Sequence, residues 1–154
     1  MEYYSPPYYF NNDISVHDMA ERLSVEYLSE ASPVNQDHVT GILYGPNPRM
    51  IVNLIICSAK YNIPINVIFL VDTCSTNLYI CDGALRSLGF TGLIPATADI
   101  IFQGVTHEAM VYPSKVSIIG SSFLTKMRTT MNIDYSRNLM FMRFDVEKEH
   151  VINR

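Results

Sequence analysis

The spacing of apolar positions changes near residue 50 of this 154-residue chain. Before that point apolar side chains recur at helical intervals, which predicts one amphipathic helix over residues 15–31. Ser15 stands at the N-cap, and Ser32-Pro33 is expected to end the helix. The apolar positions of this predicted helix are Val16, Met19, Ala20, Leu23 and Tyr27.

Residues 50–144 carry short apolar runs separated by turn residues, which predicts many short strands. The first two runs, Met50–Ser58 and Ile65–Thr73, are joined by turn residues as in a hairpin. No β-helix-β repeat appears, so we expect a mainly β, closed or sandwich-like domain with short helices. The other strands are expected at 76–81, 99–102, 108–112, 116–119, 131–135 and 139–144, and the short helices at 82–89 and 121–129.

These patterns divide the chain into five segments. They are a Tyr/Pro-rich arm (1–14), the amphipathic helix (15–31), a connector (32–49), the β domain (50–144) and a charged tail (145–154). Within the connector, only residues 41–44 have the composition of a strand. Two interpretations of the arm remain open: a peptide ligand for a partner, or a tail that packs on its own domain or stays disordered.

Composition and charge exclude several classes of function. The net charge is −4 and no Lys/Arg cluster appears, so we expect no nucleic-acid partner. The longest apolar run, Val67–Val71, is far too short to span a membrane, and the start of the chain does not read as a secretory signal. Three cysteines do not make a disulfide framework. We therefore expect an intracellular protein, cytoplasmic or nuclear, with reduced thiols and no membrane partner.

One segment stands out chemically, because a strongly apolar strand runs directly into Asp72. A carboxylate at the end of a buried strand costs free energy unless it is hydrogen-bonded, paired or protonated. Taken alone, this pattern is compatible with a turn cap in which Thr73 and Ser75 are local partners. A second motif follows in Ile118-Ile119-Gly120, an apolar strand and a glycine before the predicted helix that carries Phe123-Leu124.

With these two motifs in this order, and with Ile133-Asp134-Tyr135 closing the pattern, residues 50–144 resemble the retropepsin family, the retroviral and retrotransposon-type aspartic proteases. The resemblance implies a retrotransposon-derived β domain that is an enzyme only as a homodimer, without cofactor or metal. Asp72 would then face its twin, and Thr73 would brace the pair through its hydroxyl. Two carboxylates about 3 Å apart share one proton, so the ionised one activates water while the protonated one polarises the peptide carbonyl.

The chain departs from the family pattern in two places. Cys74 stands where the family motif has glycine, in a space that carboxyls and substrate share. Residues 91–98 are too few for the flap hairpin that closes over substrate in this family. Either the flap is lost, or a hairpin over 99–112 serves as one and the domain body lacks a hairpin.

Two functions remain open from the sequence. The first is a catalytically degenerate pseudoprotease that acts as a homodimeric dimerisation and protein-interaction module with a protein or peptide partner. The second is an active dimeric aspartic endopeptidase that uses Asp72 from each subunit.

Other chemistry is less favoured by the sequence. A cysteine nucleophile would need a base such as His107 within reach of Cys74, so we expect Cys74 to be buried and inert. Cys74 and Cys81 lack zinc-site spacing with any histidine, so we expect no metal. His17 and His38 are expected to be solvated.

Overall fold

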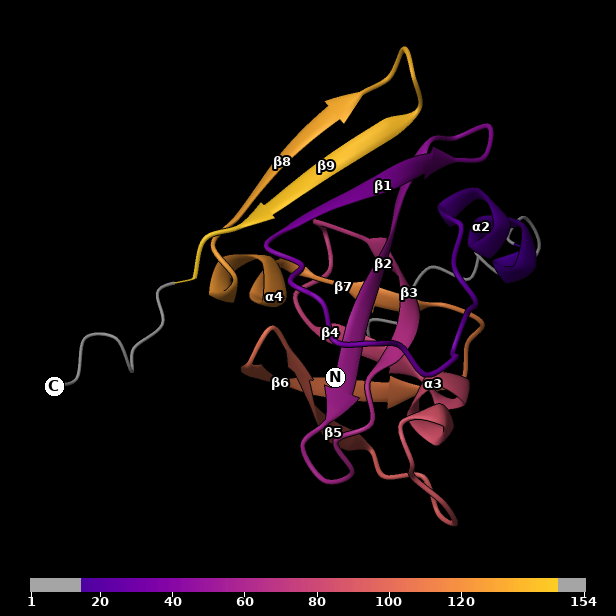
Figure 1. The fold of residues 1–154 in the computed structure, drawn as a ribbon, viewed down its shortest axis with the longest axis vertical. Helices are drawn as coiled ribbons and strands as arrows, with labels where there is room; N and C mark the ends of the chain where they lie inside the picture. The colour runs from indigo at the N-terminus through magenta and orange to yellow at the C-terminus, as the bar shows by residue number, and fades with distance from the viewer. Residues whose placement is uncertain (1–14, 147–154) are drawn as a thin grey trace, which may run out of the picture.

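The computed structural model describes residues 15–146, so the predicted arm (1–14) and most of the predicted tail (145–154) lie outside the described residues. Three helices and nine strands are present in the described range (Figure 1). The helices are α2 (Val16–Leu23), α3 (Asp82–Ser87) and α4 (Ser121–Lys126). The strands are β1 (His38–Tyr44), β2 (Arg49–Ser58), β3 (Ile65–Val71), β4 (Leu78–Cys81), β5 (Thr97–Phe102), β6 (Val105–Tyr112), β7 (Ser117–Ile119), β8 (Thr129–Asp134) and β9 (Leu139–Phe144).

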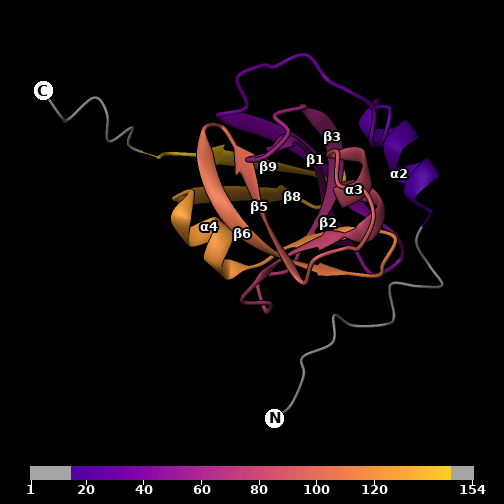
Figure 2. The same ribbon diagram turned by 90° about the horizontal axis from the view of Figure 1, so that it is seen from below.

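Six of the strands close into a barrel. Their order is β3-β7-β4-β6-β5-β2, and β2 pairs back to β3, with Ile51 opposite Leu70 and Ile56 opposite Ile65. The two views in Figures 1 and 2 show these strands wrapped around one interior. The fold class expected from the sequence, a closed and mainly β domain with short helices after an amphipathic helix, is confirmed.

The remaining three strands form a three-stranded extension of the sheet beyond the barrel (Figure 1). β1 pairs with β2 on one side and with β9 on the other, and β9 pairs with β8. β8 is therefore the outermost strand of the nine-stranded sheet. We call its side away from β9 the β8 edge.

Two apolar clusters hold the barrel together. The larger one fills the interior and includes Phe69, Phe102 and Phe123. The smaller one lies where α2 covers the other face of the sheet, with Met19 of the helix against residues such as Ile68. Because β3 contributes to both clusters, it is buried on both faces, which explains why residues 67–71 read as an unbroken apolar run rather than an alternating one.

The amphipathic helix is shorter than the sequence predicts, since it ends at Leu23 and not at residue 31. Ser15 caps its start by accepting a hydrogen bond from the backbone N–H of Asp18, as expected. Ser24 ends it in the left-handed conformation, with a φ of 58°. The next residues run alongside β3, where the N–H of Leu28 donates to the carbonyl of Asn66. This long-range pairing overrides the helical spacing of the apolar residues.

The connector also contributes more to the sheet than its composition suggests. β1 begins at His38, three residues before the expected start at Gly41. The additional residues pair with β9, so that His38 stands opposite Arg143 and Thr40 opposite Phe141. Strand formation there depends on a partner more than a hundred residues away, which local composition does not report.

We predict an acid-sensitive stability that depends on His107, a buried residue of β6 whose ring packs 4.5 Å from that of Phe123. Burial, with a smaller contribution from Lys126, lowers the pKa of His107 to about 4. The unfolded chain binds a proton on this imidazole at its ordinary pKa of 6.5, whereas the folded chain does not. The free energy of unfolding should therefore fall by about 2 kcal/mol as the pH drops from 7 towards 4.5.

Urea denaturation at the two pH values measures this fall, and His107→Gln serves as the comparison because glutamine does not titrate. The variant should lose much less stability between the two pH values than the natural chain does. An equal fall in both proteins would show that another group is responsible.

Candidate functional site

The fold brings the two sequence motifs side by side. β7 lies between β3 and β4 and runs parallel to β3, with Val71 opposite Ile119. Asp72 follows β3 directly, and its N–H donates to the carbonyl of Ile119 at 2.9 Å. The end of β7 thus positions the loop that follows β3.

Gly120 allows the loop of residues 72–77 to cross close to the end of β7. A Cβ at this position would lie 2.7 Å from the carbonyl oxygen of Ser75 and would also overlap that of Asn77. The amides that follow the glycine hold the loop in place, since the N–H of Ser121 donates to Ser75 at 2.7 Å and that of Ser122 to Thr76 at 3.0 Å. Only a residue without a side chain fits at this crossing.

Both carboxylate oxygens of Asp72 accept hydrogen bonds from its own loop. The N–H of Cys74 donates to Oδ1 at 3.0 Å, and the hydroxyl of Ser75 donates to Oδ2 at 2.9 Å. Ser75 is buried and Asp72 half-buried, so the carboxylate is held in one orientation. This is the turn-cap geometry that the sequence allowed, with Ser75 as the side-chain partner, while Thr73 is exposed.

Cys74 is exposed, so the expectation that it is buried is wrong. Its φ does not lie in the left-handed region, so a cysteine is accommodated at this position without backbone strain. The side chain points to solvent from the same turn that holds Asp72. His107, by contrast, packs in the barrel interior against Phe123. The structure therefore does not support a Cys74–His107 nucleophile and base.

Asp72 lines a hollow of about 510 Å³ that we call the Asp72 hollow. Its walls come from the β1–β2 hairpin, the end of β3, and the β8–β9 hairpin. Arg49 lies in the wall with Asp72, so the lining of the hollow includes a carboxylate and a guanidinium as well as apolar side chains. Ile133 and Tyr135, at the end of β8 and in the turn after it, contribute apolar surface that is 39% and 67% exposed.

The described chain supplies no flap over this hollow. Residues 88–96, between α3 and β5, contain no strand. β5 and β6 belong to the barrel, because β5 pairs with β2 and β6 pairs with β4. Of the two alternatives left by the sequence, the structure favours loss of the flap, and the hairpin over 97–112 is part of the domain body. Among the described residues, the walls of the hollow include none from 88–112.

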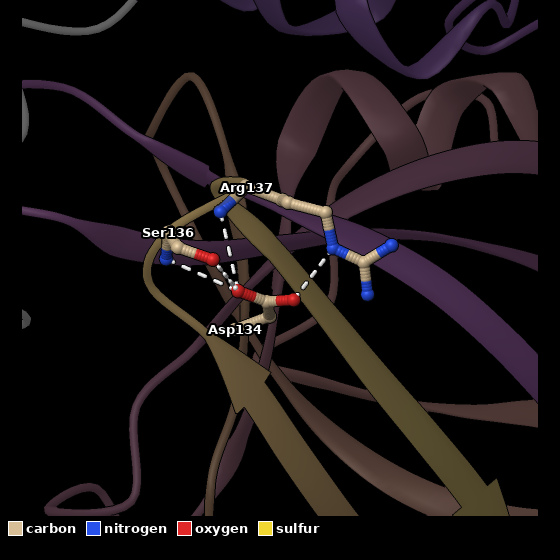
Figure 3. Close-up of polar contacts among 3 residues, drawn as sticks. All are labelled: Asp134, Ser136 and Arg137. Atoms are coloured by element: carbon tan, nitrogen blue, oxygen red, sulfur yellow. Dashed lines mark hydrogen bonds and ion pairs between the residues drawn. The ribbon is translucent and has the colours of Figure 1, made fainter.

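A polar network that the sequence reading did not identify fixes the turn between β8 and β9 (Figure 3). Asp134 Oδ1 accepts hydrogen bonds from the N–H and the hydroxyl of Ser136 and from the N–H of Arg137. Its Oδ2 accepts from Arg137 Nε at 2.6 Å. Ser136 and then Arg137 lower the pKa of Asp134 to about 2. An Asp two residues before a Ser is a recognisable turn signal, and here it holds the hairpin end that carries Ile133 and Tyr135.

The other side chains that could bind a metal do not lie close together. Within residues 15–146 no three His, Cys, Asp or Glu side chains are placed to bind a metal ion together. Cys81 is buried and lies 3.4 Å from the hydroxyl of Tyr27, while His17 and His38 are exposed, as expected. None of the helices in this range has the length and apolar character needed to cross a bilayer.

We predict that Gly120→Ala destabilises the protein by about 1–3 kcal/mol, because the new methyl group overlaps the carbonyls of the crossing loop. Gly83→Ala is the matched control, since its Cβ would meet only Leu28 at 3.9 Å and alanine favours the helix α3. Chemical denaturation of both variants measures the difference. Equal stability of the two variants would mean that the loop does not cross as described.

Of the comparisons with known proteins, the one with solved structures gives matches. Neither a family model nor a curated protein matches the chain. Solved structures do match, among them a retropepsin-like aspartic protease from Rickettsia conorii. This structure is similar over 71% of the present chain and 92% of its own, with 16% sequence identity and a TM-score of 0.49.

Proposed function

We propose that this chain is a homodimeric, retropepsin-like domain that has lost peptide cleavage and acts as a dimerisation and protein-interaction module. The observation that carries the proposal is the open Asp72 hollow, over which the described chain places no flap. A site without a lid stays wet, which weakens each electrostatic contact with a substrate and leaves the substrate poorly held.

The side chain of Cys74 also argues against cleavage. It is exposed on the turn that holds Asp72, two residues from the carboxylate, where a glycine would leave more room for a twin carboxylate or a substrate. A displacement of about 1 Å in a reacting group can lower a rate by on the order of a hundredfold. A cysteine at position 74 would leave the loop of its own subunit intact, and its effect would fall on the second copy or the substrate that faces the loop.

The surface around the hollow supports a self-complementary contact. Ile133 and Tyr135 expose apolar side chains at its wall. A homodimer about a twofold axis uses the same patch on both subunits, so one apolar wall would meet its own copy. A protein or peptide partner would then bind the assembled pair.

Active catalysis by a dimer is the second candidate, and one observation favours it. The carboxylate of Asp72 is already oriented by the N–H of Cys74 and the hydroxyl of Ser75. Preorganised groups lower the cost of reaching a transition state. In that case the two aspartates would titrate as one pair that shares a proton.

Digestion of a peptide library by concentrated protein, from acid to neutral pH, separates the two candidates. Asp72→Asn tests the site without a change of size, because the hydroxyl of Ser75 can accept a hydrogen bond from the new amide. Asp99→Asn, at an exposed aspartate on β5, is the matched control. We expect no cleavage that pepstatin inhibits, and we expect Asp72→Asn to keep the oligomeric state of the natural chain.

Pepstatin-sensitive cleavage that survives Asp99→Asn and disappears in Asp72→Asn would establish the enzyme and overturn the proposal. Cleavage that appears only after Cys74→Gly would instead support it, and would assign the loss of activity to that side chain.

A further inference from the structure

We propose that the Tyr/Pro-rich arm, residues 1–14, folds back onto its own chain and occupies a groove beside α2, with the aromatic run Tyr8–Phe10 in contact with it. The groove, which we call the α2 groove, has a volume of about 1010 Å³, against about 510 Å³ for the Asp72 hollow. The two are lined by different described residues. The inference therefore goes beyond the proposed function and does not depend on the homodimer.

The α2 groove forms because the chain turns back after α2. Ser24 ends the helix in the left-handed conformation, and the N–H of Val25 donates to the carbonyl of Ala20 at 3.0 Å. Residues 24–27 thus line the same groove as the helix that precedes them. Lys115, in the segment between β6 and β7, completes the described lining.

Part of this lining is apolar. Val16, Val25 and Tyr27 are half-buried and pack against the smaller apolar cluster, to which the buried Ala20 belongs. The hydroxyl of Tyr27 lies 3.4 Å from the buried Sγ of Cys81, so the polar end of this side chain already has a partner within the protein. The lining therefore offers apolar surface that a further segment can cover.

Two exposed carboxylates stand among these apolar groups. Glu21 and Glu26 line the groove, and Glu21 lies 3.6 Å from the exposed side chain of His17. An ionised carboxylate accepts hydrogen bonds and donates none. An occupant that combines an apolar ring with a hydroxyl donor satisfies both kinds of lining, and this is the chemistry of tyrosine.

The arm carries this chemistry within reach. Ser15, the first described residue, itself lines the groove, so the arm begins where the groove does. The aromatic run Tyr8–Phe10 stands five to seven residues before Ser15, and an extended chain of that length spans at most about 17–25 Å. α2 has eight residues and is about 12 Å long. The run can therefore reach along the whole of α2.

The sequence that joins the aromatic run to α2 favours a reversal of direction. Asn11, Asn12 and Asp13 are typical turn residues, because their short side chains bond to neighbouring backbone groups. Attachment through so short a segment gives the run an effective concentration in the millimolar range at the groove. A contact too weak to hold a free peptide is therefore sufficient to hold the arm.

Removal of the aromatic rings from the full chain tests the proposal. The test variant combines Tyr8→Ser, Tyr9→Ser and Phe10→Ser. The matched control combines Tyr3→Ser and Tyr4→Ser, which remove rings from the part of the arm furthest from the groove. Every substitution lies before Ser15, so the residues that line the groove are unchanged in both proteins.

Backbone amide NMR signals of Val25, Tyr27 and Lys115 measure occupation of the groove, because these residues line it but are remote from the arm in sequence. We expect the test variant to move all three signals by more than any signal of the barrel strand β4. The control should leave them in place. Groove signals that do not respond to loss of the aromatic run would overturn the inference.

A mixed sample identifies the copy that supplies the arm. The isotope-labelled test variant is incubated with an equal amount of unlabelled natural chain until any subunits have exchanged. An arm that stays on its own chain leaves the labelled Val25 signal at its position in the variant. Return of part of that signal to the position of the natural chain would mean that the arm of a second copy fills the groove, and would overturn the assignment to the same chain.

Discussion

The architecture depends on one close backbone crossing, where residues 72–77 pass Gly120. Neither apolar strand that leads to this point specifies a site by itself, since β3 and β7 are both typical buried strands. The parallel pairing of Val71 with Ile119 brings their ends together, and the absence of a side chain at Gly120 lets the loop lie against the start of α4. The orientation of Asp72 then follows from bonds within its own loop.

The same closure that buries the core determines what the molecule can present to a partner. A closed barrel has no free strand edge, so the three-stranded extension of β1, β9 and β8 carries the open end of the sheet. The Asp72 hollow lies between that extension and the barrel, and the turn at Asp134 holds one of its walls. A charged group of potential catalytic use and an unprotected strand edge are therefore close neighbours, although they have different physical origins.

Much of the β domain could be predicted from the sequence, because β2, β3 and the β8–β9 hairpin are set by local apolar runs and turn residues. The end of α2 could not, since it depends on the bond between Leu28 and Asn66. The motifs around Asp72 and Gly120 were recognisable, but the exposure of the Cys74 side chain depends on how the loop crosses Gly120. Such long-range contacts leave no periodic signal in a single sequence.

The central claim is that Asp72 and its neighbours face their own copy across a twofold axis. Cross-linking with a short bismaleimide tests it directly, because Cys74 is exposed whereas Cys81 is buried, and Cys57→Ser removes the remaining half-buried thiol. In a sample that sediments as a dimer, the account predicts a covalent dimer that is lost when Cys74→Ser is added. A dimeric sample in which Cys74 is modified but never linked to its twin would contradict the account.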